Sequence, residues 1–229
     1  MATLYNPNRK KGLFYMPMSG GTGRSTTPPG PAPLAQVNNV YSMEFDGTND
    51  FISINNSSET LNVDFISVSA WFYPTSLTNS ASIISTPNRG SGYHSYNIST
   101  TSNGNLRVIL YTGSNFDQTF TSAGTLNLNQ WNFICMTYDG ANVKVTLNTA
   151  SQSIARTGAL QYTVNPQGDV LIGKRNGINA QIAGKLDEVG VWNTALTAQE
   201  IQSIYDATET GKTADLSQLT TPPVAWYRM

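Results

Sequence analysis

Apolar and polar side chains alternate in short runs along the chain from Tyr41 onward, and turn residues separate the runs. The period of two is clearest at 105–111 and 142–147. This period predicts strands with one face on a core and the other toward solvent. Many short strands at regular spacing are typical of a β-sandwich or barrel. We expect strands near 41–45, 51–54, 65–73, 82–85, 95–100, 105–111, 117–121, 131–138, 142–148, 152–157, 169–173, 180–185 and 186–192.

One segment departs from the strand period and predicts a helix. Thr197 is the expected N-cap, and Glu200 completes a capping box three residues later, ahead of an apolar stripe. The helix should end before Gly211. We then expect a linker over 211–223 and a short closing strand over 224–227.

The first 40 residues differ from the rest in composition. Six prolines and a glycine-rich run at 19–23 lie there, so this segment should be extended or irregular. Residues 1–43 carry four basic and no acidic side chains, whereas the remainder carries 9 basic and 14 acidic ones. We therefore expect an extended docking arm (1–40), a sandwich (41–210) and a C-terminal linker with a closing strand (211–229).

The arm also contains large apolar side chains, which a pure linker has no reason to carry. We expect it to bind other assembly proteins or further copies of this chain, giving a homo-oligomer, through basic contacts at the rim and apolar contacts at the centre. The alternative is a solvated tail that binds nothing. The predicted docking residues are Arg9, Lys10, Lys11, Leu13, Phe14, Tyr15 and Met16.

The charge, the apolar stretches and the single cysteine limit the classes of partner and the chemistry that we expect for the chain. The net charge is -1 and only 12% of residues are charged, so the chain has no field that would attract nucleic acid. It has no 18-residue apolar stretch and no apolar run of signal-peptide length after its basic residues, so we expect neither a membrane partner nor a secretion signal. The single Cys135 lies in an apolar run, which predicts a buried, unreactive thiol.

Four segments, taken in order, resemble the laminin-G-like / concanavalin-A-like lectin family. They are Met43–Ile52 with its Phe-Asp-Gly turn, Val68–Tyr73, Gln130–Asp139, and Gly184–Thr197 with Leu-Asp-Glu-Val followed by the helix. Their order and spacing agree with the family over 41–208. The resemblance implies two packed, curved antiparallel sheets whose concave face and rim loops are the usual place for ligands. It implies no activity, because this fold carries many functions.

Pattern and resemblance together predict an all-β fold, a two-sheet antiparallel jelly-roll β-sandwich with one short C-terminal helix and an extended N-terminal arm. The segment 223–229 also looks like the strand that begins such domains, which suggests either sheet completion by these residues or a chain that once continued into another module. The side chains expected mostly in the sandwich interior are Trp71, Phe72, Trp131, Ile134 and Val189.

The residues needed for hydrolysis do not occur in a usable pattern, so we expect no catalytic residue and no enzyme activity. Retaining glycosidases need two carboxylates close together. Asp187 and Glu188 are adjacent and should point to opposite faces of their strand. His94 is the single histidine and has no acidic neighbour to orient it, so a satisfied polar or exposed loop residue is the better interpretation.

No cofactor is required, and structural calcium is the one metal to weigh. Asp46, Asn49 and Asp50 share one tight turn, and the family resemblance implies that Asp187 of the closing strand could share an ion with them. The alternative, which we favour, is that the two aspartates of the turn bond to backbone N–H groups.

We expect a non-catalytic structural or adhesion module, such as a bacteriophage capsid decoration or tail fibre protein located on the virion. The alternative is an extracellular carbohydrate-binding module of a secreted bacterial protein, and a glycoside hydrolase is a third, weaker choice. A glycan on the concave face or rim loops would need aromatic platforms and polar groups. The residues available for this are Tyr93, Tyr96, Tyr111 and Arg175.

Overall fold

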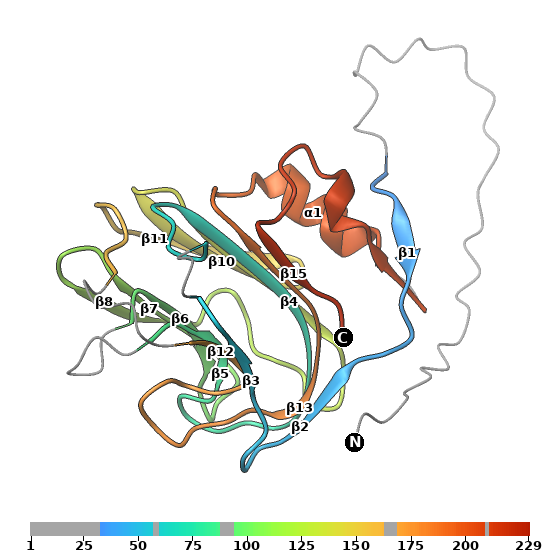
Figure 1. The fold of residues 1–229 in the computed structure, drawn as a ribbon, viewed down its shortest axis with the longest axis horizontal. Coiled ribbons are helices and arrows are strands. Elements are labelled where there is room, and N and C mark those ends of the chain that lie inside the picture. Colours follow the sequence, from blue (N-terminus) through green and yellow to red (C-terminus); the bar gives the residue numbers. More distant parts are fainter. Residues whose placement is uncertain (1–32, 57–59, 88–93, 163–168, 209–210) are drawn as a thin grey trace, which may run out of the picture.

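A computed structural model describes residues 33–56, 60–87, 94–162, 169–208 and 211–229. Over these residues two antiparallel sheets pack face to face, and one α-helix lies on the outer side of the larger sheet (Figure 1). The predicted all-β sandwich with one short helix is therefore confirmed. No helix in these ranges is long and apolar enough to span a membrane.

The larger sheet has seven strands and is built around β13. Its order is β11-β10-β9-β4-β13-β15, and β2 pairs with β13 on the same side as β15. The expected strands 180–185 and 186–192 form one strand. The seven are β2 (Met43–Asp46), β4 (Ile66–Ser76), β9 (Asn132–Tyr138), β10 (Asn142–Leu147), β11 (Ala150–Ala155), β13 (Ala183–Trp192) and β15 (Ala225–Tyr227).

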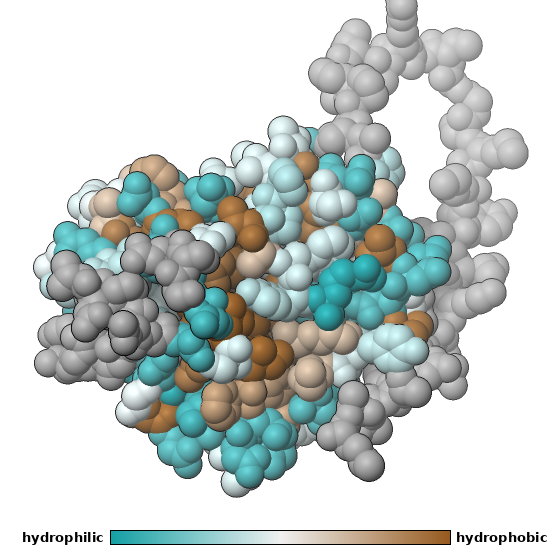
Figure 2. All heavy atoms as spheres, viewed as in Figure 1, coloured by the Kyte–Doolittle hydropathy of each residue, from teal (hydrophilic) through white to brown (hydrophobic). Residues whose placement is uncertain are grey.

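The smaller sheet has six strands in the order β3-β12-β5-β6-β7-β8. Figure 2 shows apolar side chains that reach the surface near the middle of one face of the molecule. Ile52 and Ile54 of β3 and Tyr227 of β15 are half-buried against the core. The six are β3 (Ile52–Ile54), β5 (Ser82–Ser85), β6 (Tyr96–Thr100), β7 (Leu106–Tyr111), β8 (Asn115–Phe120) and β12 (Val170–Ile172).

The space between the sheets holds Phe72, Ile134 and Val189, as expected. The prediction is wrong for Trp71, which points out of the larger sheet and packs on Phe133, with ring centroids 5.3 Å apart. Because side chains alternate along a strand, the inward Phe72 sends both of its neighbours to the outer face.

Trp131 is also placed wrongly by the sequence analysis. It is half-buried on the outer side of the larger sheet, just before β9, and meets the edge of Tyr73 with ring centroids 5.7 Å apart. The run from Trp131 to Cys135 is almost wholly apolar, so its period does not show which set of alternate side chains faces inward.

Helix α1 (Ala198–Asp206) begins where predicted. The Thr197 side chain accepts from the backbone N–H of Glu200, and the Glu200 side chain accepts from the Thr197 backbone in return. Its buried Ile201 and Ile204 pack on the outer face of the larger sheet, in a second apolar cluster that includes Trp192. The helix therefore covers part of that face.

Two segments expected in the arm and the linker pair with each other. β1 (Gln36–Asn38) is antiparallel to β14 (Lys212–Ala214), and a short 3₁₀ helix (Leu216–Gln218) follows. Strands of three residues are too short to show a period, so the sequence pattern did not reveal them.

A bulge interrupts the pairing of β13 with β4 between Asp187 and Gly190. Glu188 has a φ of 52°, in the left-handed region. An extra residue in one strand re-aims the side chains beside it. Both carboxyl groups therefore reach the same amide, that of Asn39, and the prediction that they face opposite sides is wrong.

Candidate functional site

The outer face of the six-stranded sheet carries the polar groups that most resemble a binding site. Ile98 and Val108 point into the core, so the side chains next to them along β6 and β7 point outward. The register then places Asn97 of β6 and Asp117 of β8 in one row across this face, with Arg107 of β7 in the next. The outer face of the other sheet is partly covered by α1.

Arg107 and Asp117 form a two-point ion pair on this face. The Arg107 Nε donates to Asp117 Oδ1 at 2.6 Å, and Nη2 donates to Oδ2. The third nitrogen, Nη1, donates to the Ser80 hydroxyl at 3.1 Å. Hydrogen bonding to Asp117 raises the pKa of Arg107 further above its ordinary value. The two side chains are 28% and 31% exposed, so a ligand can reach both.

His94 is buried beside this pair and its hydrogen bonds are satisfied. Its Nδ1 lies 2.9 Å from the Thr86 carbonyl oxygen and so carries the proton, which leaves Nε2 to accept from Arg175 Nε at 3.3 Å. Burial, with a smaller effect from Arg175, lowers the His94 pKa, although the Thr86 carbonyl acts in the opposite sense. The neutral ring therefore orients Arg175 and has no free lone pair with which to act as a base.

Arg175 lies within electrostatic range of the ion pair. Burial lowers its pKa first, the charge of Arg107 lowers it further, and Asp117 acts in the opposite sense. These two guanidinium groups and the carboxylate therefore influence one another electrostatically, and together they carry a net charge of +1.

Asn97 forms the buried floor of this region. Its Nδ2 donates to the Ser82 hydroxyl at 2.6 Å and lies 3.4 Å from the Ile84 carbonyl oxygen, while its Oδ1 has no partner. A buried polar atom without a partner is costly, and such atoms are few in folded proteins. Because Asn97 is fully buried, a ligand at the surface cannot reach this atom. We call Arg107, Asp117 and Arg175 the sheet-face cluster.

The sequence analysis found one member of this cluster. Arg175 is where a ligand contact was expected, whereas Tyr96 is fully buried toward the core and Tyr111 is half-buried at the end of β7. Tyr93 lies outside the described residues. The alternation in 105–111 would have placed Arg107 outside, but it does not identify a pairing with the next strand.

The turn at Asp46 has the geometry of a backbone cap. Asp46 Oδ1 accepts from the N–H groups of Thr48 at 2.7 Å and Asn49 at 3.1 Å, and Asp50 Oδ2 accepts from the Asp46 N–H at 3.0 Å. The bond from Thr48 contributes most to lowering the Asp46 pKa.

Asp187 does not join that turn, since Asp46 pairs with Ala183, four residues away along β13. Among the described residues, no group of three or more His, Cys, Asp or Glu side chains could hold a metal. The structure thus brings together the three turn residues and leaves the fourth predicted calcium ligand elsewhere. The seven predicted docking residues of the arm lie outside the described residues.

Comparison with known proteins gives one family. The model described as the concanavalin A-like lectin/glucanases superfamily matches residues 46–202. No curated protein matches the chain.

Solved structures of similar fold share little sequence with the chain. A mutant NanB sialidase of Streptococcus pneumoniae aligns with a TM-score of 0.59 at 16% identity, over 75% of this chain and 28% of the sialidase. The CBM40 of a Ruminococcus gnavus IT-sialidase, bound to α2,3 sialyllactose, gives 0.57 at 13% identity over 76% of this chain and 99% of that one. A heptameric SAP-like pentraxin of Limulus polyphemus aligns with a TM-score of 0.50 at 17% identity, over 78% of this chain and 97% of the pentraxin chain. The chain thus matches whole modules but only about a quarter of the sialidase.

Proposed function

Since the chain belongs to the concanavalin A-like lectin/glucanase superfamily, we propose that it is a carbohydrate-binding module that holds a glycan at the sheet-face cluster without cleaving it. The observation that carries this proposal is the partly exposed, two-point ion pair of Arg107 and Asp117 on the outer face of the six-stranded sheet, with the Arg175 guanidinium within electrostatic range.

The chemistry of the cluster suits sugar hydroxyl groups. A hydroxyl both donates and accepts, so it can donate to Asp117 and accept from an arginine N–H. Charged partners make these hydrogen bonds stronger than neutral ones. Arg107 is held by Asp117 and Ser80, and Arg175 contacts His94, so the donors are fixed before a ligand arrives, which reduces the entropic cost of binding.

The carboxylate of the cluster and the three candidate catalytic residues that the sequence analysis weighed all have other partners or lie elsewhere among the described residues. Asp117 is occupied by Arg107, and both ring nitrogens of His94 have partners. Asp187 and Glu188 are buried in the other sheet. Binding without turnover is also consistent with the CBM40 module named above, whose complex contains α2,3 sialyllactose.

A glycan array followed by calorimetry with the best ligand tests the proposal, and the panel should include sialylated and neutral oligosaccharides. Arg107→Ala should weaken binding about 10-fold or more, because it removes hydrogen bonds to a charged group. Arg175→Ala should also weaken binding while the thermal melt remains cooperative. Lys144→Ala, which removes a cation from the other sheet, is the matched control. Binding that survives both site variants, or no binding to any glycan, would contradict the proposal.

We further propose that the module serves adhesion on a virus particle, as a capsid decoration or tail fibre protein. The basic, proline-rich segment before residue 40, with its apolar insert, favours this role, while the similar structures named above lend it no support. Purified particles should contain the chain in fixed stoichiometry, and its absence from them would leave the secreted module as the better choice.

A further inference from the structure

Asp187 and Glu188, here called the carboxyl pair, are buried on the outer side of β13, with exposed fractions of 7% and 4%. Carboxyl groups of this kind are rarely buried unless they are paired. Glu188 is also held in left-handed backbone geometry, which costs free energy for a residue other than glycine. Because burial of the carboxyl groups and the backbone geometry of Glu188 both cost free energy, the surroundings of the pair must stabilise it.

Apart from the Glu188 backbone N–H, which donates to Asp187 Oδ1, the groups that donate to the carboxyl pair come from the two ends of the described chain. Asn39 Nδ2 lies 3.1 and 3.0 Å from the two Asp187 oxygens and 2.6 Å from Glu188 Oε1. The Thr213 hydroxyl donates to Glu188 Oε1 at 2.7 Å. Thr213 lies within β14, and Asn39 directly follows β1.

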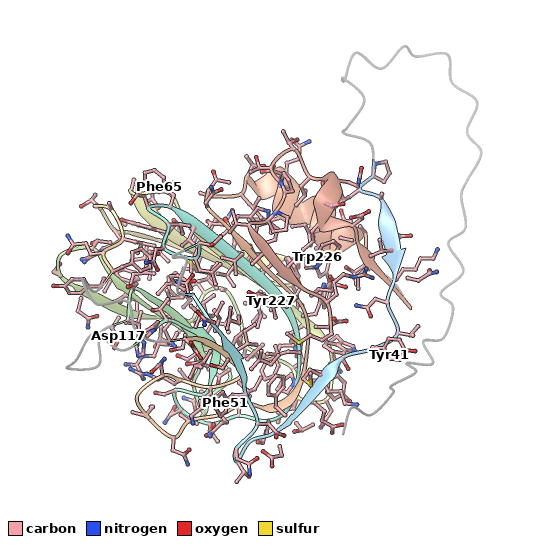
Figure 3. The ribbon with its side chains drawn as sticks, in the orientation of Figure 1. Tyr41, Phe51, Phe65, Asp117, Trp226 and Tyr227 are labelled. Atoms are coloured by element: carbon pink, nitrogen blue, oxygen red, sulfur yellow. The ribbon has the colours of Figure 1, made fainter. Side chains whose placement is uncertain are left out.

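The remaining donors come from β15 and the residues after it. The Trp226 indole N–H donates to Glu188 Oε2, and Arg228 Nε lies 3.5 Å from Glu188 Oε1. The Met229 backbone N–H donates to Asp187 at 3.2 Å. Trp226 and Tyr227 leave β15 toward opposite sides, since Trp226 packs with the outer cluster and Tyr227 with the core (Figure 3).

The donors and the carboxyl pair belong to different parts of the sequence. The pair lies within residues 46–202, which the family model matches, whereas all four donating side chains lie outside that range. The sandwich therefore presents a buried anionic site, and the segments added at its two ends supply the hydrogen bonds that satisfy it.

We propose that the carboxyl pair couples the two terminal segments, so that freeing Val224–Met229 from β13 also loosens Gln36–Asn39, and the reverse. This inference is independent of the glycan site, which lies on the other sheet. It makes the β1–β14 pair responsive to whatever binds or displaces β15.

The physical basis is that both segments depend on the same few oxygen atoms. The amide of Asn39 has two N–H groups facing three carboxylate oxygens, so it cannot replace the donors that Trp226 supplies. When the C-terminal segment leaves, water reaches the pair, and each remaining hydrogen bond loses the low-dielectric surroundings that strengthened it. Coupling of this kind is reciprocal, so the same free energy links the two segments in both directions.

Segment-resolved hydrogen exchange of the full chain tests the coupling. Trp226→Phe removes the N–H donor and keeps an aromatic ring, so exchange at 225–227 should become faster. If the segments are coupled, exchange at 36–38 and 212–214 should also rise, by roughly 10-fold for the loss of a hydrogen bond to a charged group. Trp131→Phe is the matched control, because Trp131 lies away from the pair and contacts Tyr73.

The reverse direction uses Asn39→Ala, which should accelerate exchange at 225–227 although none of those residues is changed. The free energy of local opening that the double variant loses should then be smaller than the sum of the losses in the two single variants. Acceleration confined to the segment that carries the substitution would overturn the proposal. If Trp226→Phe also accelerates exchange in β9, Thr213→Val is used in its place. Faster exchange at the distant segment 225–227 would then support the coupling, and acceleration confined to 212–214 would overturn it.

Discussion

The guanidinium group of Arg107 on β7 binds both carboxylate oxygens of Asp117 on the neighbouring β8. The pair is about a third exposed, so water screens much of its attraction. Asp117→Ala should therefore lower the free energy of unfolding by about 1 kcal/mol or less. Its effect on glycan affinity should be larger, because it also releases Arg107. Urea melts measure the first quantity, and a loss several times greater would mean that the pair is structural.

The pH dependence of stability should reveal Asp187. Burial, followed by the charge of Glu188, raises the Asp187 pKa from 3.8 to about 7. The folded protein then binds more protons than the unfolded chain between these values, so this group stabilises the fold at acidic pH and that contribution is lost as pH rises toward 7. Between about pH 5 and pH 8 the loss should be on the order of 2 kcal/mol.

Urea melts of wild type and Asp187→Asn at those two pH values isolate the contribution, since the variant lacks the titrating group. The variant should be the less pH-sensitive protein. Equal pH dependence in the two proteins would assign the effect to other groups.

Two aromatic substitutions distinguish the observed strand orientation from the predicted one. Phe72 is 1% exposed between the sheets, so Phe72→Ala should cost about 3–5 kcal/mol. Trp131 is half-buried on the outer side, so Trp131→Ala should cost less than half of that. Denaturant melts of the two variants, run side by side, check the order. A reversed order would place Trp131 back in the core.

The hydrogen bonds of the Asp46 turn predict that a chelator does not change the thermal stability of the protein. Because its carboxylates already accept backbone N–H groups, removing divalent cations should leave the melting temperature of wild type unchanged. The shared-calcium hypothesis instead requires a lower melting temperature with chelator in wild type and no change in Asp187→Asn. Differential scanning calorimetry with and without chelator separates the two.

Cys135 should be unreactive in the folded protein. Burial raises its thiol pKa to about 12, so almost no thiolate exists near neutral pH. A thiol reagent should modify it only as fast as the chain unfolds, and addition of denaturant should make the reaction complete. Rapid labelling of the native protein would mean that β9 opens locally.

Much of the fold was predictable because its local signals were strong. The capping box at Thr197 and the alternation in 142–147 each depend on neighbours in sequence, and each was found in the structure. The orientation of Trp71 was wrongly predicted, although Ser67 and Ser69 place its face of the alternating strand outside the core. Its large apolar ring is buried on that outer face by packing on Phe133 and on Tyr205 of α1.

The sheet-face cluster and the carboxyl pair escaped prediction for a different reason. Arg107 pairs with a residue ten positions away, and Asn39 meets Glu188 across 149 residues, so neither contact leaves a periodic trace. The bulge at Glu188 also broke the alternation on which the prediction of opposite faces relied.

The order of events in folding follows from the place of β13. Its partners on one side are β2 and β15, so Leu186 faces Met43 and Gly190 faces Trp226. β1 likewise has its partner near the other end of the chain, because Gln36 pairs with Ala214 of β14. Contacts so distant in sequence close large loops and slow the search for the native state. The nascent chain must therefore keep β2 unpaired until most of its length has been synthesised, and the hairpins β6–β7, β7–β8 and β9–β10, whose partners are consecutive, are free to form first.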